Sequence, residues 1–170
     1  MSSIERRENI LEFLLQKNKP IKGNEIAEKY KVTRQVIVKD IAILRAEGNS
    51  IIATPDGYII NRNSSKTKTI IAVSHTEDQM FDEMSTIIKY GGIIEDVIVE
   101  HPIYGEIKGL LMVTNQNELE KFCSSYISQK AKLLSVLTNG IHLHTIAAES
   151  KENIELIINE LKCKNYIISD

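Results

Sequence analysis

Apolar residues in the first fifty positions recur at three- and four-residue steps in two separate stretches, which is the period of amphipathic helices. The first predicted helix has Ser3 as its cap and ends near Pro20, because proline cannot continue the hydrogen-bond ladder. A short helix is predicted over residues 24–30. After a brief connection, Thr33 is placed to cap a longer helix that ends before Gly48.

These helices are followed by two apolar runs around Pro55-Asp56-Gly57, which predict a hairpin. The order of helix, short helix, turn, capped helix and hairpin indicates a winged helix-turn-helix over residues 1–62. The predicted recognition helix buries one apolar face, and its exposed side chains suit base edges and phosphates. The predicted DNA-binding residues are Thr33, Arg34, Gln35 and Lys39. The alternative is a small helical bundle with a solvated basic face and no DNA ligand.

The pattern changes after a polar stretch, residues 61–68, which is the predicted linker. Residues 69–170 alternate between β-rich runs and helical periods, so the whole chain is of the α+β class. The second domain is predicted to be an α/β sandwich sensor domain with a ferredoxin-like βαββαβ core. Its strands are predicted at residues 69–73, 93–99, 103–113, from Gly140 onward and 166–168. Its helices are predicted to run from Thr76 to Tyr90, from Gln116 to Ser128, and from a cap at Ser150.

Four histidines are present, all in this second domain, and two of them form the motif His142-Leu143-His144. In an extended strand, residues i and i+2 project from one face, so the two imidazoles are expected to stand side by side. Paired imidazoles joined by a further ligand suit a divalent transition metal. The competing interpretation is a polar pair on a solvated strand face.

Two other residues are placed to complete such a site. His75 follows a predicted strand directly, and Glu83 lies about two turns into the next helix. Imidazoles with one carboxylate would bind Zn, Ni, Fe or Mn and leave a position open for a small molecule. Against this, an isolated helical glutamate is usually solvated.

Composition and charge agree with this division of the chain. The 170 residues carry a net charge of -2, but residues 1–62 hold 11 Lys and Arg against 8 Asp and Glu. A basic N-terminal part beside an acidic remainder is compatible with nucleic-acid binding by the former. No run approaches eighteen apolar residues and the start has no secretory core, so we expect a cytoplasmic protein without a membrane span. The two cysteines fit no metal or redox spacing.

Three segments resemble those of the niacin-responsive repressors, which are bacterial regulators with a winged helix and a three-histidine domain. They are residues 33–41 (TRQVIVKDI), 101–107 (HPIYGEI) and 137–146 (LTNGIHLHTI). The resemblance covers nearly the whole chain. It implies a homodimeric repressor of NAD-biosynthesis and niacin-uptake genes that binds operator DNA, with nicotinic acid as corepressor.

The resemblance also implies specific site residues. The metal ligands would be His75, Glu83, His142 and His144, and residues 130–137 would line the effector pocket. His101 and Tyr104 are candidate effector-binding residues, because His101 could hydrogen-bond the nicotinate carboxylate or a metal ligand. A turn histidine satisfied by the backbone is the alternative for His101.

Two further functions compete with a niacin-responsive repressor. A repressor that senses the metal itself would use the same ligands without an organic effector. A small metal-dependent hydrolase could also contain His-x-His, but no general base lies beside the motif and barrel-type hydrolases need a longer chain. We therefore predict a DNA-binding protein that is not an enzyme. A fused ligase activity is disfavoured, because no glycine-rich phosphate loop is present.

Overall fold

The computed structural model describes residues 1–61 and 66–169, and the chain forms one compact unit on each side of the gap. Four residues of the predicted linker, 62–65, lie outside the described residues. The next strand begins at Thr67, two residues earlier than predicted, so Thr67 and Lys68 belong to the second unit and not to a linker.

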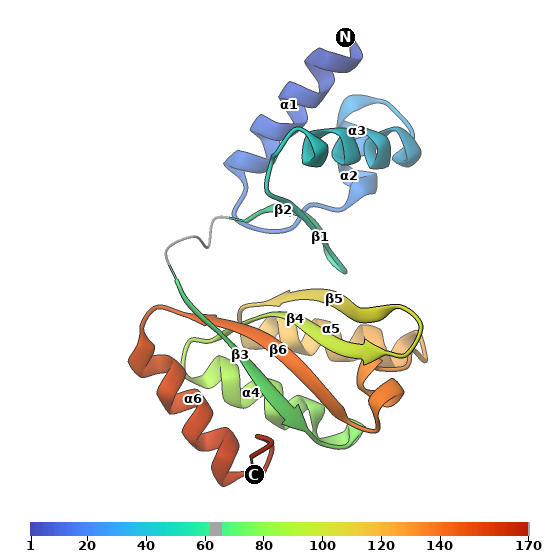
Figure 1. The fold of residues 1–170 in the computed structure, drawn as a ribbon. Helices are drawn as coiled ribbons and strands as arrows, with labels where there is room; N and C mark the ends of the chain where they lie inside the picture. The colour runs from blue at the N-terminus through green and yellow to red at the C-terminus, as the bar shows by residue number, and fades with distance from the viewer. Residues whose placement is uncertain (62–65, 170) are drawn as a thin grey trace. The chain divides into compact units, whose positions relative to one another are not determined.

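The N-terminal unit is a helix-turn-helix with a small wing, as predicted. Its elements are α1 (Ser3–Gln16), α2 (Gly23–Tyr30), α3 (Arg34–Ala46), β1 (Ile51–Thr54) and β2 (Gly57–Ile60) (Figure 1). Thr33 caps α3 by accepting a hydrogen bond from the Val36 N–H. The cap of α1 is Ser2 instead of the predicted Ser3, because Ser2 and Glu5 form a reciprocal capping box.

Apolar side chains from all three helices and the wing form the core of this unit. Ile37, Ile41 and Leu44 of α3 are buried, as their spacing predicts. One buried carboxylate adds an ion pair between helices: Arg6 Nε donates to Asp40 Oδ2 at 2.7 Å, and Asp40 is 2% exposed. This pair joins α1 to α3.

The second unit is a mixed α/β domain built on a four-stranded sheet. Its strands are β3 (Thr67–Ser74), β4 (Ile93–His101), β5 (Gly105–Val113) and β6 (Ile141–Ala148). Helices α4 (Met80–Lys89), α5 (Gln116–Ser128) and α6 (Lys151–Cys163) pack on one face of the sheet (Figure 1). The short 3-10 helices η1 (Glu77–Gln79) and η2 (Leu134–Thr138) precede α4 and β6. The capping pair Thr76 and Gln79 and the cap Ser150 are confirmed.

The order of the strands is β3-β6-β4-β5, with every neighbouring pair antiparallel. A ferredoxin-like sheet places its first strand in the interior, whereas β3 lies at an edge here and β6 is interior. The predicted ferredoxin-like order is therefore not found. Both strand–helix–strand units are still split by one inserted strand, β6 within β3-α4-β4 and β4 within β5-α5-β6.

The predicted strand 166–168 is reduced to a single bridge, Val73 to Ile167. The Ser74 N–H donates to the Tyr166 carbonyl at 2.9 Å, and the Ile168 N–H donates to the Ala72 carbonyl at 3.0 Å. The C-terminal segment thus runs beside β3 for three residues. Among the described residues, no helix has the length and apolar character needed to cross a membrane.

Candidate metal centre and DNA-binding surface

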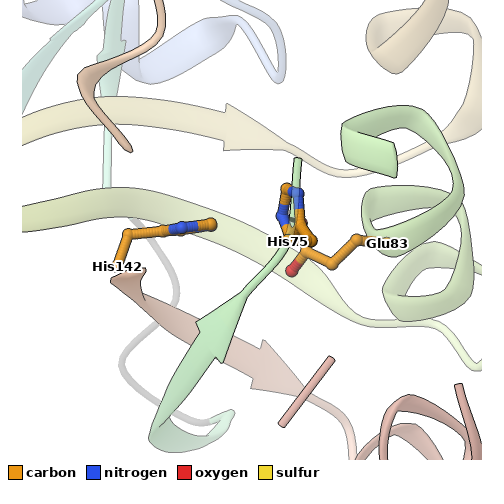
Figure 2. Close-up of side chains that lie close together, drawn as sticks. All are labelled: His75, Glu83 and His142. Carbon is orange, nitrogen blue, oxygen red and sulfur yellow. Dashed lines mark ion pairs between the residues drawn. The ribbon is translucent and has the colours of Figure 1, made fainter. Parts of the chain in front are cut away.

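Three histidines and one glutamate converge on the helix-covered face of the sheet. His142 and His144 project from the same face of β6, with ring centroids 4.8 Å apart. His75 follows the end of neighbouring β3, and its ring lies 4.8 Å from that of His142. Glu83 reaches the group from α4, so the side chains in Figure 2 come from three parts of the chain: the residue after β3, α4 and β6. All four residues are buried, and the predicted arrangement of the histidine pair is confirmed.

Each of the three imidazoles is oriented by a main-chain carbonyl that lies within hydrogen-bonding distance of Nδ1. The acceptors for His75, His142 and His144 are the carbonyls of Thr76, Gly140 and Asp96, at 2.8, 2.9 and 2.5 Å. A carbonyl oxygen can only accept, so each Nδ1 carries the proton. In the neutral ring, Nε2 then presents its lone pair as a ligand. This is the usual way in which proteins orient metal-binding histidines.

The Glu83 carboxylate lies among these Nε2 atoms. Its Oε2 is 3.4 Å from His75 Nε2 and 3.5 Å from His144 Nε2. The ligand atoms of His75, Glu83 and His142 all lie within 4.8 Å of one another. Two atoms that are each about 2.1 Å from a tetrahedral ion lie roughly 3.4 Å apart, so the observed spacing suits a first-row divalent metal.

The hydrogen bonding of the group also fits a cation. His75 Nε2 and both carboxylate oxygens of Glu83 are buried without a hydrogen-bond partner among the described residues. Glu83 is 0% exposed, and a buried carboxylate is costly unless a positive charge compensates it. One bound metal ion would satisfy the carboxylate and the imidazole lone pairs together. His75, Glu83 and His142 could thus hold a metal, and His144 remains a predicted fourth ligand.

The pKa values of the group follow from burial and mutual proximity. Burial alone would raise the pKa of Glu83, but His144, His75 and His142 outweigh it and lower that pKa to about 2. Burial and the neighbouring His144 lower the pKa of His142 to about 4. For His75 and His144, burial opposes the charged form, but Glu83 and the carbonyl partners raise the pKa. At neutral pH, Glu83 is therefore an anion and His142 a neutral imidazole.

Tyr166 was not predicted to belong to the site. Its ring packs edge-on against His75, with centroids 5.6 Å apart, and its hydroxyl donates to Asp82 Oδ2 at 2.8 Å. Lys164 Nζ lies 2.9 Å from the same carboxylate. The sequence gives no signal for this role of Tyr166, because the two residues in contact are 91 positions apart.

A small cavity of about 40 Å³ lies beside the histidines, within the sheet-and-helix sandwich. Apolar side chains form most of its wall, including Met84 of α4 and Phe122 of α5. Within the stretch 130–137, which was predicted to line the effector pocket, Leu133, Leu134 and Ser135 line this cavity. The contribution of these residues to effector binding stays a prediction.

His101 and Tyr104 lie elsewhere: His101 ends β4, and Tyr104 lies in the turn that joins β4 to β5. The Ile103 and Tyr104 N–H groups lie 3.2 and 3.3 Å from His101 Nδ1, which accepts from them. The His101 ring also packs on that of Tyr104, with centroids 5.0 Å apart. The structure therefore does not bring either residue into the histidine group. These hydrogen bonds are those of a histidine that stabilises its own turn, and the predicted contact of His101 and Tyr104 with an effector remains untested.

The predicted DNA-binding residues share one exposed surface of the N-terminal unit. Thr33, Arg34, Gln35 and Lys39 are all exposed at the start of α3 or in its first half. A groove of about 300 Å³ extends from Arg34 to the wing, with Lys22, Asn24 and Tyr58 in its wall. These three residues were not predicted as contacts, although Lys22 and Asn24 flank the start of α2. An exposed recognition helix beside a wing is the surface that such folds present to a major groove.

Both units match families of known proteins. Residues 6–59 match a helix-turn-helix domain family, and residues 68–170 match the 3H domain family. A Thermotoga maritima protein described as "Probable transcription repressor NiaR" is 41% identical over 166 residues, covering 98% of this chain and 95% of the relative. The Bacillus subtilis protein described as "Transcription repressor NadR" is 34% identical over 169 residues, covering 97% of this chain and 94% of the relative. The chain therefore belongs to the family of the NiaR and NadR proteins, with a helix-turn-helix domain followed by a 3H domain.

Proposed function

We propose that this protein is a DNA-binding transcriptional repressor of NAD-biosynthesis and niacin-uptake genes, with nicotinic acid as corepressor and a divalent metal in its 3H domain. The main support is the end-to-end similarity to two proteins described as transcription repressors, which covers both units. The exposed start of α3 would bind DNA, and the buried donor group of His75, Glu83 and His142 would bind the metal. Both relatives are described as transcription repressors, so the proposal is for a regulator and not a hydrolase.

In this proposal, nicotinic acid binds better to the form that holds DNA than to the form that releases it. An effector with equal affinity for both forms would shift nothing, however tightly it bound. The metal, when bound, supplies a Lewis-acidic position that a ring nitrogen or a carboxylate can occupy. The chain itself contributes the four candidate ligands, the apolar wall beside them and the carbonyls that orient the imidazoles. Two copies acting as a homodimer would read the two halves of an operator.

A repressor that responds to the metal alone is the second candidate. One observation favours it: His75, Glu83, His142 and His144 could by themselves complete a tetrahedral coordination sphere. An octahedral ion at the same ligands would keep two positions for an organic molecule. The two candidates therefore differ in whether nicotinic acid is needed once the metal is saturating.

An operator titration separates these candidates. Operator DNA can be obtained by selecting sequences that the full-length protein retains from a random pool. We expect that, at saturating metal, nicotinic acid tightens operator binding by about 5- to 150-fold, the usual range of coupling between two sites. Tight binding that follows the metal and ignores nicotinic acid would favour the metal-sensing repressor. Binding that ignores both would contradict each of them.

Replacing Arg34 with alanine tests the recognition helix. Arg34 is exposed in the first turn of α3, so its removal is expected to cost roughly 1–3 kcal/mol of operator binding and to relax specificity at one base position. Arg45→Ala, in the last turn of the same helix, is the control and should weaken binding evenly across sequences. Binding curves for the selected operator and for single-base variants would measure both effects. Unchanged affinity of Arg34→Ala would remove that residue from the interface.

A further inference from the structure

The region beside the metal ligands contains two spaces that share one wall. The inner cavity of about 40 Å³ is lined by His75, Ser135 and mainly apolar side chains. An outer depression of about 350 Å³ is lined by polar residues and again by His75 and Ser135. Helix η2, which contains Ser135, therefore forms the boundary between the exterior and the histidine group.

Ser135 is unusual among the residues of this boundary. The residue is 6% exposed, and its hydroxyl is not among the fully buried polar atoms without a partner, so it is accessible from the spaces that it lines. Its carbonyl is occupied, because it accepts from the Gly140 N–H at 2.8 Å and from the Thr138 hydroxyl. A hydroxyl in such a place can complete its hydrogen bonding with water or with a ligand. The side chain thus supplies a polar group next to the proposed metal position.

The inner cavity is too small for a complete organic effector. A volume of about 40 Å³ holds roughly three water molecules, whereas small-molecule sites usually measure about 300–1,000 Å³. The outer depression falls within that range. A molecule that reaches His75 from this depression would extend through the boundary and pass Ser135. Met80 and Met84 in the wall of the inner cavity can adapt their shape to an incoming ring.

We propose that the two spaces join into one effector site and that the Ser135 hydroxyl recognises the polar group of the effector that does not face the metal. This inference rests on the proposed function, and it identifies a specificity-determining residue for it. The ligand class is a small planar ring with two polar ends, one for the metal and one for Ser135. The apolar wall around Leu134 and Phe122 would contact the ring between them.

Ser135→Ala tests this assignment, because it removes one oxygen and leaves the metal ligands intact. Calorimetric titration of the metal-loaded, full-length protein with nicotinic acid should give a roughly tenfold higher Kd for this variant. Its metal-to-protein ratio should equal that of the wild type. Ser124→Ala, at an exposed position of α5, is the matched control and should change neither quantity.

Two truncated ligands refine the test. Pyridine lacks the carboxylate and benzoate lacks the ring nitrogen, so one of them lacks the group that Ser135 recognises. That ligand should bind the wild type and Ser135→Ala equally, while the other should lose affinity like nicotinic acid. Equal Kd values of wild type and Ser135→Ala for nicotinic acid would overturn the inference, and so would loss of metal from the variant. A metal-loaded wild type that binds no nicotinic acid would instead overturn the corepressor proposal, and this inference with it.

Discussion

Replacing His142 with alanine is expected to lower the affinity of the 3H domain for a divalent metal by more than about 100-fold. Even residues that only orient metal ligands cost about 10–100-fold when changed, and His142 belongs to the donor group itself. Its ring also lies 4.8 Å from those of His75 and His144, so its loss opens the centre of the group. Elemental analysis and calorimetric titration with Zn²⁺ or Ni²⁺ would measure the effect.

The matched control for this substitution is His101→Ala. His101 is the histidine that lies outside the donor group: it ends β4 and accepts from backbone N–H groups of the turn that follows. We expect its removal to leave the metal content unchanged. The His142→Ala protein should also lose any tightening of operator binding by nicotinic acid, while keeping weak metal-independent DNA binding. A His142→Ala protein with wild-type metal affinity would refute the donor group.

Gly140→Ala is expected to destabilise the 3H domain by about 2–5 kcal/mol. Gly140 has φ +94°, where a Cβ is strained, and that Cβ would lie 2.5 Å from the His75 carbonyl oxygen. Left-handed strain costs about 1–2 kcal/mol and displacement of packed atoms a further 1–3 kcal/mol. Because the Gly140 carbonyl also orients His142, the variant should bind metal less tightly. Differential scanning calorimetry would report the shift of the 3H-domain transition.

Gly105→Ala provides the control within the same domain. Gly105 also has a positive φ, +70°, but no atom lies within 4 Å of the position that its Cβ would take. It should therefore show only the conformational strain, about 1–2 kcal/mol, and normal metal binding. Equal destabilisation by the two substitutions would mean that close packing between Gly140 and the His75 backbone contributes nothing.

Local signals explain why much of the fold could be predicted. The helix over residues 116–128 is recovered with its exact bounds, because periodicity and capping are properties of neighbouring residues. The same information was present for the first cap, where Ser2 and Glu5 have the capping-box spacing and Ser3 does not. Strand order carries no such local signal. It depends on which strand fills the position between β3 and β4, and the sequence alone does not exclude the ferredoxin-like alternative.

In the candidate site, too, local sequence patterns predict some features and leave others undetermined. The two-residue period of a strand predicts that His142 and His144 share a face, and helix geometry allows Glu83 to return towards His75. The hydrogen-bond acceptors of the imidazoles could not be predicted from the sequence. Asp96 accepts from His144 through its carbonyl, at a point where the pairing of β4 changes register, and no side-chain pattern reveals a main-chain acceptor. That Ser135 lines both the inner cavity and the outer depression can be recognised only from the folded structure.

The short C-terminal segment has a double consequence for the 3H domain. By pairing with Ala72 and Ser74 it occupies backbone groups on the outer side of β3, which would otherwise form an open sheet margin. Its Tyr166 at the same time shields one flank of an imidazole. Proteolytic loss of the segment would therefore expose an edge of β3 that could pair with strands of other protein molecules. The same few residues thus protect the edge of the sheet from aggregation and pack against the histidine group.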